Sequence, residues 1–592
     1  MSEDHIDAPI VKRIGYNAVD LWELSKKPDD HELLFDYPTV YLIYNRDKKG
    51  KYDVYVGETN DIKQRTRQHL IEDPKTREDW DELRISEDAS MIIIGHNRFN
   101  KSLTLDIENK MMLYMSGITD VDRLNNRREN EQNKYFTDDI RDVIFSKIWR
   151  ELRTVDNDLF PLERIIQDSA IFKASPFHKL TDEQNDAKNL ILERVSEALI
   201  GNQTGQLILV EGEAGSGKTV LLSTIFYLMT QYSHNDEFPE FKNTRNFLLV
   251  NHDEQLKVYE DTIEKLGIRG DGEKIVSKPT TFINNHEPED KVDVVLVDEA
   301  HLLWTQGKQS YRGKNQLRDI MARAKVTIAI FDPKQVLKTE EYLEAEQILA
   351  LENHAYKQNN LIKLKNQLRI NADDQTVDWI RAITDERVIK PMHKDSKGYD
   401  LRIFDDPVKM YHEIQKLNGD REKAGLSRLL ATFDWPYKQK GHPDDSPYWM
   451  VNTGDLSLPW NLQLPVDESQ SHLRKHLSWA EQSQTVDEVG STYTIQGFDL
   501  NYAGVIIGPS VKYVDGKIVF DPELSENKNA VRNRTLSNGK KAQVSDELLA
   551  NELNVLLTRG VNGLFIYAVD SDLNSRLHGE MMTKIRMVRN NE

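Results

Sequence analysis

The first residues that could do chemistry lie in a glycine-rich segment between an apolar run and a helical pattern. Residues 212–219 read GEAGSGKT, directly after LILV and directly before TVLLSTIFYLM. Backbone N–H groups of such a loop can surround phosphate oxygens, while a lysine and a hydroxyl complete the site. We predict that Lys218 neutralises nucleotide phosphates, that Thr219 holds Mg²⁺, and that three glycines shape the cradle: Gly212, Gly215 and Gly217.

An acidic pair follows another apolar run about 80 residues later. VVLVDEAH at 294–301 reads as a buried strand that ends in Asp298 and Glu299. Asp298 is predicted to bind Mg²⁺ through water, and Glu299 to polarise the attacking water. A surface-exposed strand end is the alternative, and the preceding phosphate loop makes it the weaker interpretation.

Five further segments carry polar residues that could touch a nucleotide. Gln184 in LTDEQ could pair with adenine, although an ordinary helix N-terminal turn explains it equally well. Gln335 in FDPKQ could sense the γ-phosphate, and Arg369 in NQLR could act as an arginine finger. A lone arginine is more often solvated or ion-paired, so each segment is weak alone. TIQGFD and LLTRG near the C-terminus add Gln496, Gly497, Asp499 and Arg559.

The N-terminal region carries a second pattern. TVYLIYN at 39–45 and YVGET at 55–59 read as a hairpin joined by RDKKG. NDIKQRTRQHL then begins a helix that Asn60 could cap. Further on, LTLDIENKMMLYM reads as an apolar helix that carries an acid.

Five side chains of this region could work together. Arg65 and His69 share one helix face, and Glu108 lies inside the apolar helix, as an exposed acid or a metal ligand. Tyr41 and Tyr55 lie on the two predicted strands and could equally pack across the hairpin. A small structural α/β domain is therefore the alternative to a catalytic one.

Apolar runs indicate the elements that must position these residues. Continuous runs of four to six residues suit parallel strands buried on both faces, and they predict two α/β lobes divided near 360–400. The runs occur at 207–210, 247–250, 294–297, 326–331, 505–508 and 564–569. The polar stretch 523–548 is predicted to be a loop, and it carries Lys528, Arg532, Arg534, Lys540 and Lys541.

Composition narrows the class of protein. The 592 residues contain 78 Lys and Arg against 98 Asp and Glu, a net charge of −20, and no cysteine. Disulfides, thiol catalysis and Cys-ligated zinc are excluded, and no apolar run is long enough for a transmembrane helix. A soluble, cytoplasmic protein without a signal peptide is expected. A generic polyanion binder is disfavoured, so nucleic acid would need a local basic groove, to which the 523–548 loop would contribute.

The order of the nucleotide segments resembles a superfamily 1-type helicase core with two RecA-like lobes. LTDEQ looks like the Q motif, GEAGSGKT motif I, VDEAH motif II, FDPKQ motif III, NQLR motif IV, TIQGFD motif V and LLTRG motif VI. The amino-acid sequence around these segments is similar to that of a prokaryotic family of uncharacterised ATPases related to Schlafen helicase domains. This resemblance covers about 70% of the chain. It implies ATP as cofactor, ATP hydrolysis and a nucleic-acid partner.

The N-terminal pattern resembles the GIY-YIG nuclease family over about residues 37–130. TVY stands where GIY is usual, with Thr39 in place of the glycine, and YVG stands for YIG. The resemblance implies that Glu108 binds Mg²⁺, with Mn²⁺ as an alternative, and that Arg65 binds the scissile phosphate. Tyr41, with Tyr55 or His69, would orient or deprotonate water. Asn125 or Asn126 matches the late asparagine of the family.

The expected architecture is therefore α/β: a small GIY-YIG domain followed by two RecA-like parallel-sheet lobes. The predicted boundaries are 1–150 for the nuclease domain with its N-terminal extension, 151–175 for a connector, 176–360 for lobe 1 and 361–592 for lobe 2 with irregular insertions.

The expected function is an ATP-dependent nuclease that favours DNA over RNA, in prokaryotic anti-phage defence or in repair. A homo-oligomer or a protein activator fits the same pattern. The alternatives are a nucleic-acid-binding NTPase switch, an RNA-directed enzyme, and a scaffold with a vestigial ATPase.

Overall fold

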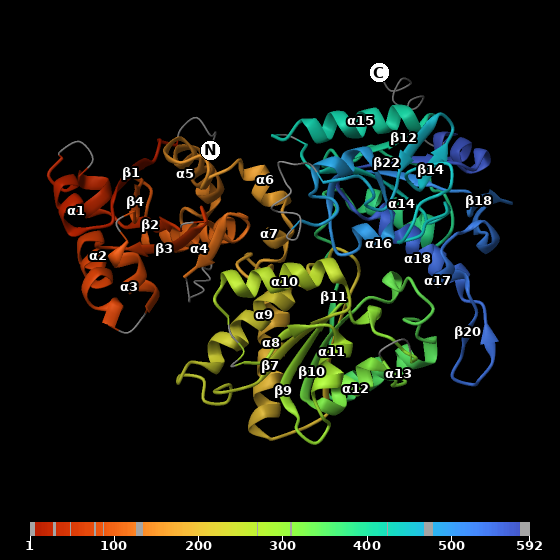
Figure 1. Ribbon diagram of the computed structural model, residues 1–592, viewed down its shortest axis with the longest axis horizontal. Helices are drawn as coiled ribbons and strands as arrows, with labels where there is room; N and C mark the ends of the chain where they lie inside the picture. Colours follow the sequence, from red (N-terminus) through yellow and green to blue (C-terminus); the bar gives the residue numbers. More distant parts are fainter. Residues whose placement is uncertain are drawn as a thin grey trace. The chain divides into compact units, whose positions relative to one another are not determined.

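The computed structural model describes residues 6–27, 31–47, 49–75, 78–86, 88–125, 134–268, 270, 272–307, 311–422, 424–466 and 477–579. The chain divides into two compact units. The first comprises Met1–Leu180 and Val258–Glu273, and the second comprises Thr181–Lys257 and Lys274–Glu592. Figure 1 shows that both are built from sheets and helices. Among the described residues, no helix is both long and apolar enough to cross a membrane.

The first unit is built on one five-stranded sheet of order β1-β4-β2-β3-β5. β2 and β3 form the predicted antiparallel hairpin, and β5 pairs in parallel with β3. The strands are β1 (Ile10–Gly15), β2 (Thr39–Arg46), β3 (Tyr52–Thr59), β4 (Ser90–Gly95) and β5 (Val121–Leu124). The helices are α1 (Ala18–Leu24), α2 (Ile62–Ile71), α3 (Glu78–Ile85), α4 (Lys101–Ser116), α5 (Arg141–Val155), α6 (Glu163–Asp168) and α7 (Ala170–Ala174).

Two local details differ from the sequence prediction. The cap of α2 is Asp61 and not Asn60, because the Asp61 side chain accepts from the backbone N–H of Gln64. The segment predicted as a connector forms α6 and α7, which pack on α4. A Cβ at Gly117, the C-cap of α4, would lie 2.8 Å from Ile166 and 2.9 Å from Phe172. These helices therefore extend the apolar core of the first unit.

Lobe 1 of the second unit has an all-parallel sheet of order β11-β6-β10-β9-β7-β8. Helices α8 and α9 cover one face, and α11, α12 and α13 cover the other (Figure 1). The strands are β6 (Gln206–Gly212), β7 (Asn246–Val250), β8 (Val276–Ser277), β9 (Val292–Asp298), β10 (Ala324–Phe331) and β11 (Leu361–Leu364). The helices are α8 (Asp182–Ile200), α9 (Lys218–Ser233), α11 (Pro279–Asn285), α12 (Gln316–Arg323) and α13 (Ala345–Lys357). Helix α10 (Asp253–Lys265) begins in this unit, and its residues from Val258 onward belong to the first unit.

Lobe 2 has a second parallel sheet, of order β12-β22-β17-β13-β16. Helix α15 packs on one face, and α14 and α18 on the other. The strands are β12 (Asp400–Ile403), β13 (Ser427–Ala431), β16 (Val489–Gly490), β17 (Leu500–Ile507) and β22 (Gly560–Ala568). The helices are α14 (Asp374–Thr384), α15 (Pro407–Gly419), α16 (Thr492–Ile495), α17 (Lys528–Val531) and α18 (Ser545–Leu557). Three hairpins are added: β14 (Met450–Thr453) with β15 (Leu456–Pro459), β18 (Val511–Val514) with β19 (Lys517–Phe520), and β20 (Arg534–Thr535) with β21 (Lys541–Ala542).

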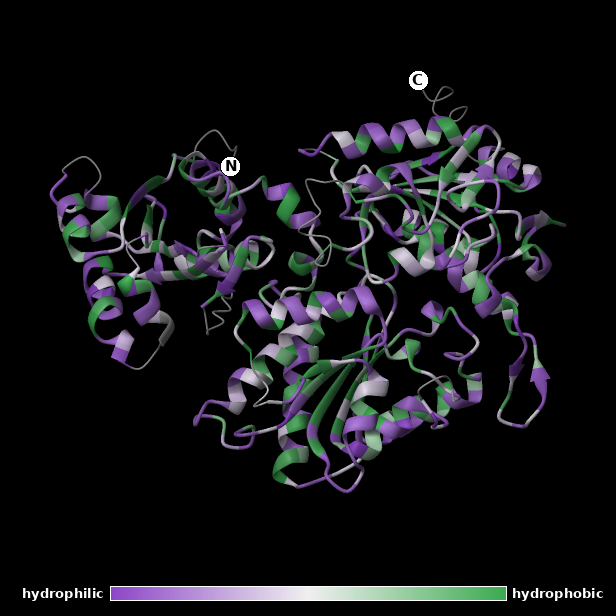
Figure 2. Cartoon of the chain, viewed as in Figure 1, coloured by the Kyte–Doolittle hydropathy of each residue, from purple (hydrophilic) through white to green (hydrophobic). Residues whose placement is uncertain are grey.

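The predicted apolar runs form the central strands of both sheets, which confirms the α/β fold with two parallel-sheet lobes. Figure 2 shows the strands of lobe 1 in the hydrophobic colour, beneath helices of mixed hydropathy. The predicted lobe boundary at 360 differs from the structure. β11 begins at Leu361 and pairs with β6, so it completes the sheet of lobe 1.

The basic stretch 523–548 is not a plain loop, because it contains α17 and the β20–β21 hairpin. Arg534 is buried, and its guanidinium donates to Thr339 O and Thr305 Oγ1, both at 2.7 Å. Arg532 donates to Thr339 Oγ1 at 2.8 Å. Both arginines thus join the hairpin to lobe 1. The other three predicted cations, Lys528, Lys540 and Lys541, are exposed. Among the described residues, none of these lysines makes a hydrogen bond to lobe 1 like those of the two arginines.

Candidate functional site

The N-terminal unit brings its two tyrosines, the arginine and the histidine together. Tyr41 comes from β2, and Arg65 and His69 from the buried face of α2. The Tyr41 hydroxyl lies 2.7 Å from His69 Nε2, and Arg65 Nε donates to the Tyr41 hydroxyl at 3.3 Å. Tyr55 on β3 lies beside them, with its ring 6.1 Å from the Tyr41 ring and 5.2 Å from His69.

Gly57 makes room for this arrangement. The β2–β3 register pairs Tyr41 with Gly57, so both lie on the same face of the sheet. A Cβ at Gly57 would lie 2.5 Å from the ring of Tyr41, closer than carbon atoms can pack. The third residue of YVG must therefore lack a side chain if Tyr41 is to reach His69.

Two residues missing from the sequence prediction hold His69 in place. His69 Nδ1 lies 2.6 Å from Asp73 Oδ2, and the imidazole stacks on Trp80 with ring centroids 3.7 Å apart. A carboxylate on Nδ1 selects the tautomer in which Nε2 accepts, so the Tyr41 hydroxyl donates to His69. The i,i+4 spacing of His69 and Asp73 was the available signal for this pair. Nothing local marks Trp80.

Burial controls the protonation of both tyrosines. Burial raises the pKa of Tyr41 well above its usual value, and the neighbouring Tyr55 hydroxyl adds to the rise, while Arg65 acts against it. Burial also raises the pKa of Tyr55, Arg65 lowers it, and the charge of Glu108 raises it further. Both hydroxyls are therefore protonated at neutral pH, and His69 is the acceptor of the cluster.

Glu108 lies on α4, largely buried, with its charge close enough to influence Tyr55. Lys101 and Thr104 share that helix face, and both bond the carboxylate of Glu58 on β3, Thr104 Oγ1 at 3.2 Å. Within the described ranges, no group of three or more His, Cys, Asp or Glu could hold a metal ion. One carboxylate suits Mg²⁺, which binds through one or two carboxylates plus water and substrate phosphates. The donor set therefore fits the predicted ion.

Of the two candidates for the late asparagine of the family, the structure describes Asn125. Asn125 follows β5, and its backbone N–H donates to Val54 O of β3 at 3.0 Å. Asn126 lies outside the described residues.

The glycine-rich loop of lobe 1 connects β6 to α9 in the predicted order. Gly215 and Gly217 adopt φ of +87° and +74°. A Cβ would lie 2.5 Å from Arg369 Cβ at Gly215, and 2.1 Å from Gln184 Nε2 at Gly217. Only glycine fits both positions. The two left-handed glycines thus give the loop the turn that a nucleotide cradle requires, with Gly212 and Thr219 at its two ends.

Lys218 is directed into this loop. Its Nζ donates to Gly212 O at 2.5 Å and Glu213 O at 2.8 Å, and lies 3.5 Å from Asp332 Oδ2. Asp332 follows β10 and also accepts from Gln335 Nε2 at 2.7 Å. Arg559, buried at the end of α18, donates to Gln335 Oε1 at 3.2 Å. A chain of polar contacts thus runs from the phosphate loop of lobe 1 to lobe 2.

The acidic pair lies at the carboxyl end of β9. Asp298 Oδ2 accepts from Gln255 Nε2 at 2.6 Å, and Glu299 adopts a left-handed φ of +49°. Glu299 Oε2 lies 3.0 Å from His301 Nε2. Burial acts to raise the pKa of Glu299, but the charges of His301, Lys218 and Arg559 outweigh it and lower the pKa to about 2. Glu299 is therefore ionised at neutral pH.

Two arginines from distant segments approach the same loop. Arg369 packs against Gly215, and its Nε lies 2.5 Å from Asp499 Oδ1. Burial lowers the pKa of Arg559 to about 9, and the charge of Arg369 contributes to that shift. The Arg559 guanidinium therefore stays protonated at pH 7. Arg369 is thus ion-paired with Asp499, and Arg559 is hydrogen-bonded to Gln335, so the arginine-finger role of either stays a prediction.

The remaining predicted residues contact the glycine-rich loop or residues beside it. Gln184 completes the capping box of α8, where its Oε1 accepts from the N–H of the N-cap Thr181, and its Nε2 donates to Gly217 O at 3.3 Å. Its amide therefore supports the loop from below, and adenine recognition stays a prediction. Gln496 Nε2 donates to Gln335 O at 3.4 Å, and Gly497 has φ of +85° beside Gln255.

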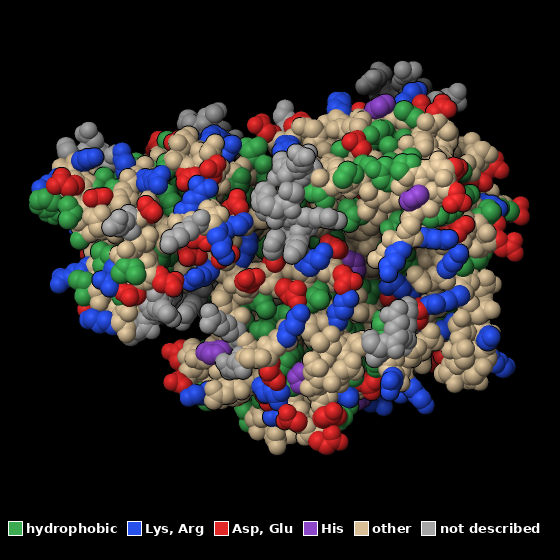
Figure 3. All heavy atoms as spheres, in the orientation of Figure 1, with side chains coloured by type: hydrophobic (Ala, Val, Ile, Leu, Met, Phe, Trp, Pro, Cys, Tyr) green, Lys and Arg blue, Asp and Glu red, His purple; other side chains and the backbone are tan. Residues whose placement is uncertain are grey.

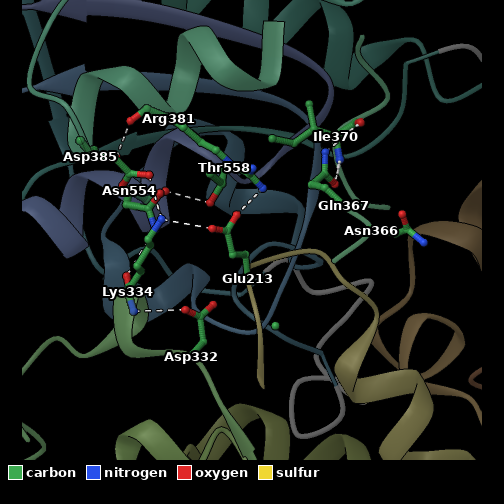
Figure 4. Close-up of polar contacts among 12 residues, drawn as sticks. Glu213, Asp332, Lys334, Asn366, Gln367, Ile370, Arg381, Asp385, Asn554 and Thr558 are labelled. Carbon is green, nitrogen blue, oxygen red and sulfur yellow. Dashed lines mark hydrogen bonds and ion pairs between the residues drawn. The ribbon is translucent and has the colours of Figure 1, made fainter. Parts of the chain in front are cut away.

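An ion-pair network missing from the sequence prediction joins the loop to lobe 2 (Figure 4). Glu213 occupies a variable position of the glycine-rich motif, and its carboxylate pairs with Arg381 of α14 and with Lys334 Nζ at 3.1 Å. Lys334 also lies 2.8 Å from Asp385 Oδ2. Figure 4 shows Glu213 between Arg381 and Lys334.

Comparisons with known proteins agree with both halves of the chain. Residues 205–570 match the family described as Schlafen group 3, DNA/RNA helicase domain, and residues 37–111 match the GIY-YIG catalytic domain. A relative from Saccharomyces cerevisiae, titled "Uncharacterized protein YPL245W", is 35% identical over 405 residues, 63% of this chain and 83% of its own length. The resemblance inferred from the motifs is thus confirmed.

Similar solved structures share less sequence identity with this chain. The Pif1 helicase from Candida albicans matches 70% of this chain and 100% of its own, at 12% identity and a TM-score of 0.27. A DEAD box protein from Methanococcus jannaschii matches 70% of this chain and 94% of its own, at 14% identity and a TM-score of 0.24.

Proposed function

The chain belongs to the Schlafen group 3 DNA/RNA helicase family and carries a GIY-YIG catalytic domain, and from this premise we propose that it is an ATP-dependent nuclease that cuts DNA. The two domains give its general activities: it is an ATPase of the helicase type with an endonuclease domain. The proposal adds that ATP turnover controls cleavage of the nucleic acid that the helicase domain binds.

One observation carries the nuclease part: the hydrogen-bonded series Arg65–Tyr41–His69–Asp73. Because Asp73 fixes His69 Nδ1–H, Nε2 can accept the phenolic proton of Tyr41, whose oxygen in turn takes a proton from the attacking water. The water oxygen bonds to phosphorus as the P–O bond to the leaving oxygen breaks, and that oxygen takes a proton from solvent water. Arg65 neutralises the phosphate. A Mg²⁺ on Glu108 would add positive charge at that phosphate.

The ATPase part is supported by the residues around the glycine-rich loop. Lys218 and the loop N–H groups would hold the phosphates, and Thr219 and Asp298 would hold Mg²⁺. Glu299, ionised and buried, would polarise water, and Arg369 or Arg559 would stabilise the γ-phosphate in the transition state. Gln335 contacts both Asp332 and Arg559, so it is positioned to report the state of the phosphate to lobe 2.

The biological setting is the finer part of the proposal. Defence against phage in the cytoplasm is one setting and DNA repair is the other. A relative of this chain occurs in Saccharomyces cerevisiae, so the activity is proposed independently of either setting.

A cleavage assay tests the proposal. The full chain is incubated with Mg²⁺ and with DNA or RNA of equal sequence, with and without ATP. We expect cleavage of DNA that Glu108→Gln abolishes and that Lys218→Ala makes insensitive to ATP. The exposed Glu151→Gln, on α5 of the same unit, is the matched control and should cut normally. Equal cleavage by Glu108→Gln and the native chain would refute the nuclease assignment.

A further inference from the structure

Lobe 2 contains a cavity whose lining residues, apart from Thr494 of TIQGFD, lie outside the predicted nucleotide motifs. It has a volume of about 520 Å³, within the range of ligand pockets. Its wall comes from the segment after β13, the start of β14, the loop after β15, α16 and α17. Aromatic residues line it: Phe433, Tyr437, Trp449 and Tyr493. Two exposed lysines, Lys438 and Lys528, stand at its rim.

Asn461 is the unusual residue of this cavity. Its side chain is 94% buried, since its relative exposure is 6%, yet neither Oδ1 nor Nδ2 has a hydrogen-bond partner among the described residues. Its backbone is fully used, because its N–H donates to Val489 O and its carbonyl accepts from the Tyr437 hydroxyl, both at 3.1 Å. Most buried side-chain amides in folded proteins are hydrogen-bonded, so the unpaired Asn461 carboxamide leaves a donor and an acceptor available to a ligand in the cavity.

The backbone at this point is held in an unfavourable conformation. Asn461 and Leu462 are consecutive non-glycine residues with φ of +63° and +60°. Glu488, fully buried, accepts from the N–H of Leu462 at 3.1 Å and of Gln463 at 2.7 Å. Trp479 Nε1 donates to the same carboxylate at 3.2 Å. Strained backbone that the surroundings hold so firmly is typical of binding sites.

The second wall of the cavity is equally well fixed. The Tyr493 hydroxyl donates to Asn527 Oδ1 at 2.8 Å, and Asn527 Nδ2 donates to the buried Glu552 at 2.6 Å. Glu552 also accepts from the N–H of Phe433 at 2.5 Å. The aromatic walls are therefore preformed, so a planar ligand would not have to order them.

We propose that this cavity binds one unpaired nucleobase of a single-stranded nucleic acid, which stacks on its aromatic walls while Asn461 reads the base edge. A carboxamide offers one donor and one acceptor side by side, which complements the donor–acceptor edge of a base. Aromatic faces bind bases by stacking, and lysines at the rim contact the neighbouring phosphates. The inference rests on the proposed nucleic-acid function and names the part of the strand that lobe 2 holds.

Binding of labelled 20-nucleotide DNA and RNA homopolymers to the full chain tests this inference without catalysis. An abasic strand of equal length measures the contribution of the bases. We expect the native chain to bind at least one homopolymer about ten-fold more tightly than the abasic strand. Asn461→Gly should remove most of this preference, because glycine keeps the left-handed backbone and removes only the carboxamide. Trp449→Leu, a second variant, should weaken the same preference through lost stacking.

The chain provides a matched control in Asn359, which is exposed and has φ of +56°. Asn359→Gly makes the same substitution in the same backbone region, far from the cavity in sequence, and should bind every strand like the native chain. The slope of log affinity against log salt should stay unchanged in Asn461→Gly, because a base contact releases no counterions, and should fall in Lys438→Ala.

The outcomes separate this inference from the proposed function. Asn461→Gly with native preference for bases, or a native chain that binds all strands and the abasic strand alike, overturns the cavity assignment. If cleavage and ATPase activity are present in that case, the proposed function stands. If a free nucleoside monophosphate displaces the labelled strand as strongly as the unlabelled homopolymer does, the cavity is still a base site, and its ligand is a free nucleotide.

Discussion

His69 Nδ1 lies 2.6 Å from Asp73 Oδ2 while His69 Nε2 lies 2.7 Å from the Tyr41 hydroxyl. The imidazole of His69 thus connects the half-buried carboxylate of Asp73, just after α2, to the buried phenol of Tyr41 on the sheet. The pairing decides which ring nitrogen can accept a proton, and this makes Asp73 a positioning residue of the nuclease cluster.

Asp73→Asn tests that role. The amide cannot hold His69 in one tautomer as a carboxylate does, so we expect cleavage to fall about 10- to 100-fold, as for other residues that orient a catalytic histidine. The ATPase rate should not change. Single-turnover cleavage by Asp73→Asn is compared with that of Glu72→Gln, an exposed neighbour, which should cut normally. Native cleavage in Asp73→Asn would contradict the assigned role.

Gly57→Ala is expected to destabilise the N-terminal unit. The added Cβ would lie 2.5 Å from the Tyr41 ring, and displacement of a buried ring by overpacking costs about 1–3 kcal/mol. A lower thermal midpoint and a loss of cleavage should appear together. Gly419→Ala, where no atom lies within 4 Å of the new Cβ, is the control. Equal thermal midpoints for the two variants would rule out the steric explanation.

Glu299 should act as a permanently ionised group in ATP hydrolysis. Its pKa of about 2 means that the carboxylate is charged throughout pH 5–8, so this residue should produce no acidic limb in the rate profile. Glu299→Gln should lower kcat about 100-fold or more at every pH in that range. Exposed Glu346→Gln serves as the control. An acidic limb near pH 6 that disappears in Glu299→Gln would show that the pKa is not depressed.

Glu552 should make the stability of the chain depend on pH. Burial and the charge of Asp434 raise its pKa from 4.5 to about 7. A raised folded-state pKa stabilises the fold below pH 4.5, and this contribution, roughly 3 kcal/mol at most, is lost as pH rises to 7. The native thermal midpoint should therefore fall more between pH 5 and pH 8 than that of Glu552→Gln. Parallel pH dependence in the two proteins would contradict a raised pKa, and exposed Glu523→Gln should behave like the native chain.

The basic stretch after residue 523 should separate into structural and binding residues. Arg534→Ala leaves Thr339 O without its 2.7 Å donor in a buried place, so the thermal midpoint should fall. Lys540→Ala with Lys541→Ala removes two exposed charges and should leave the midpoint unchanged while nucleic-acid affinity and its salt dependence decrease. Thermal melts and binding at two salt concentrations check both. If the lysine pair binds like the native chain, the hairpin is not part of the groove.

The sequence predicted the two parallel-sheet lobes, the glycine-rich loop and the tyrosine–arginine–histidine–glutamate pattern because these depend on short-range order. Buried parallel strands require continuous apolar runs, and a phosphate loop requires glycines at fixed offsets, so neighbouring residues carry the information. The β2–β3 hairpin and the helix that carries Arg65 and His69 follow from the same local periodicity.

Long-range packing decided what the sequence could not predict. Arg534 reads as a surface cation in a polar stretch, but the fold buries it against Thr305 and Thr339, more than 190 residues earlier. The strand β11 follows the predicted lobe boundary in the sequence and still belongs to lobe 1, because among the described strands it pairs only with β6. Glu213, a variable position of its motif, acquires a role only through Arg381 and Lys334. Asn461 lies in no motif, and its unpaired carboxamide becomes evident only when five separate segments close around it, because hydrogen-bond satisfaction is a property of the folded chain.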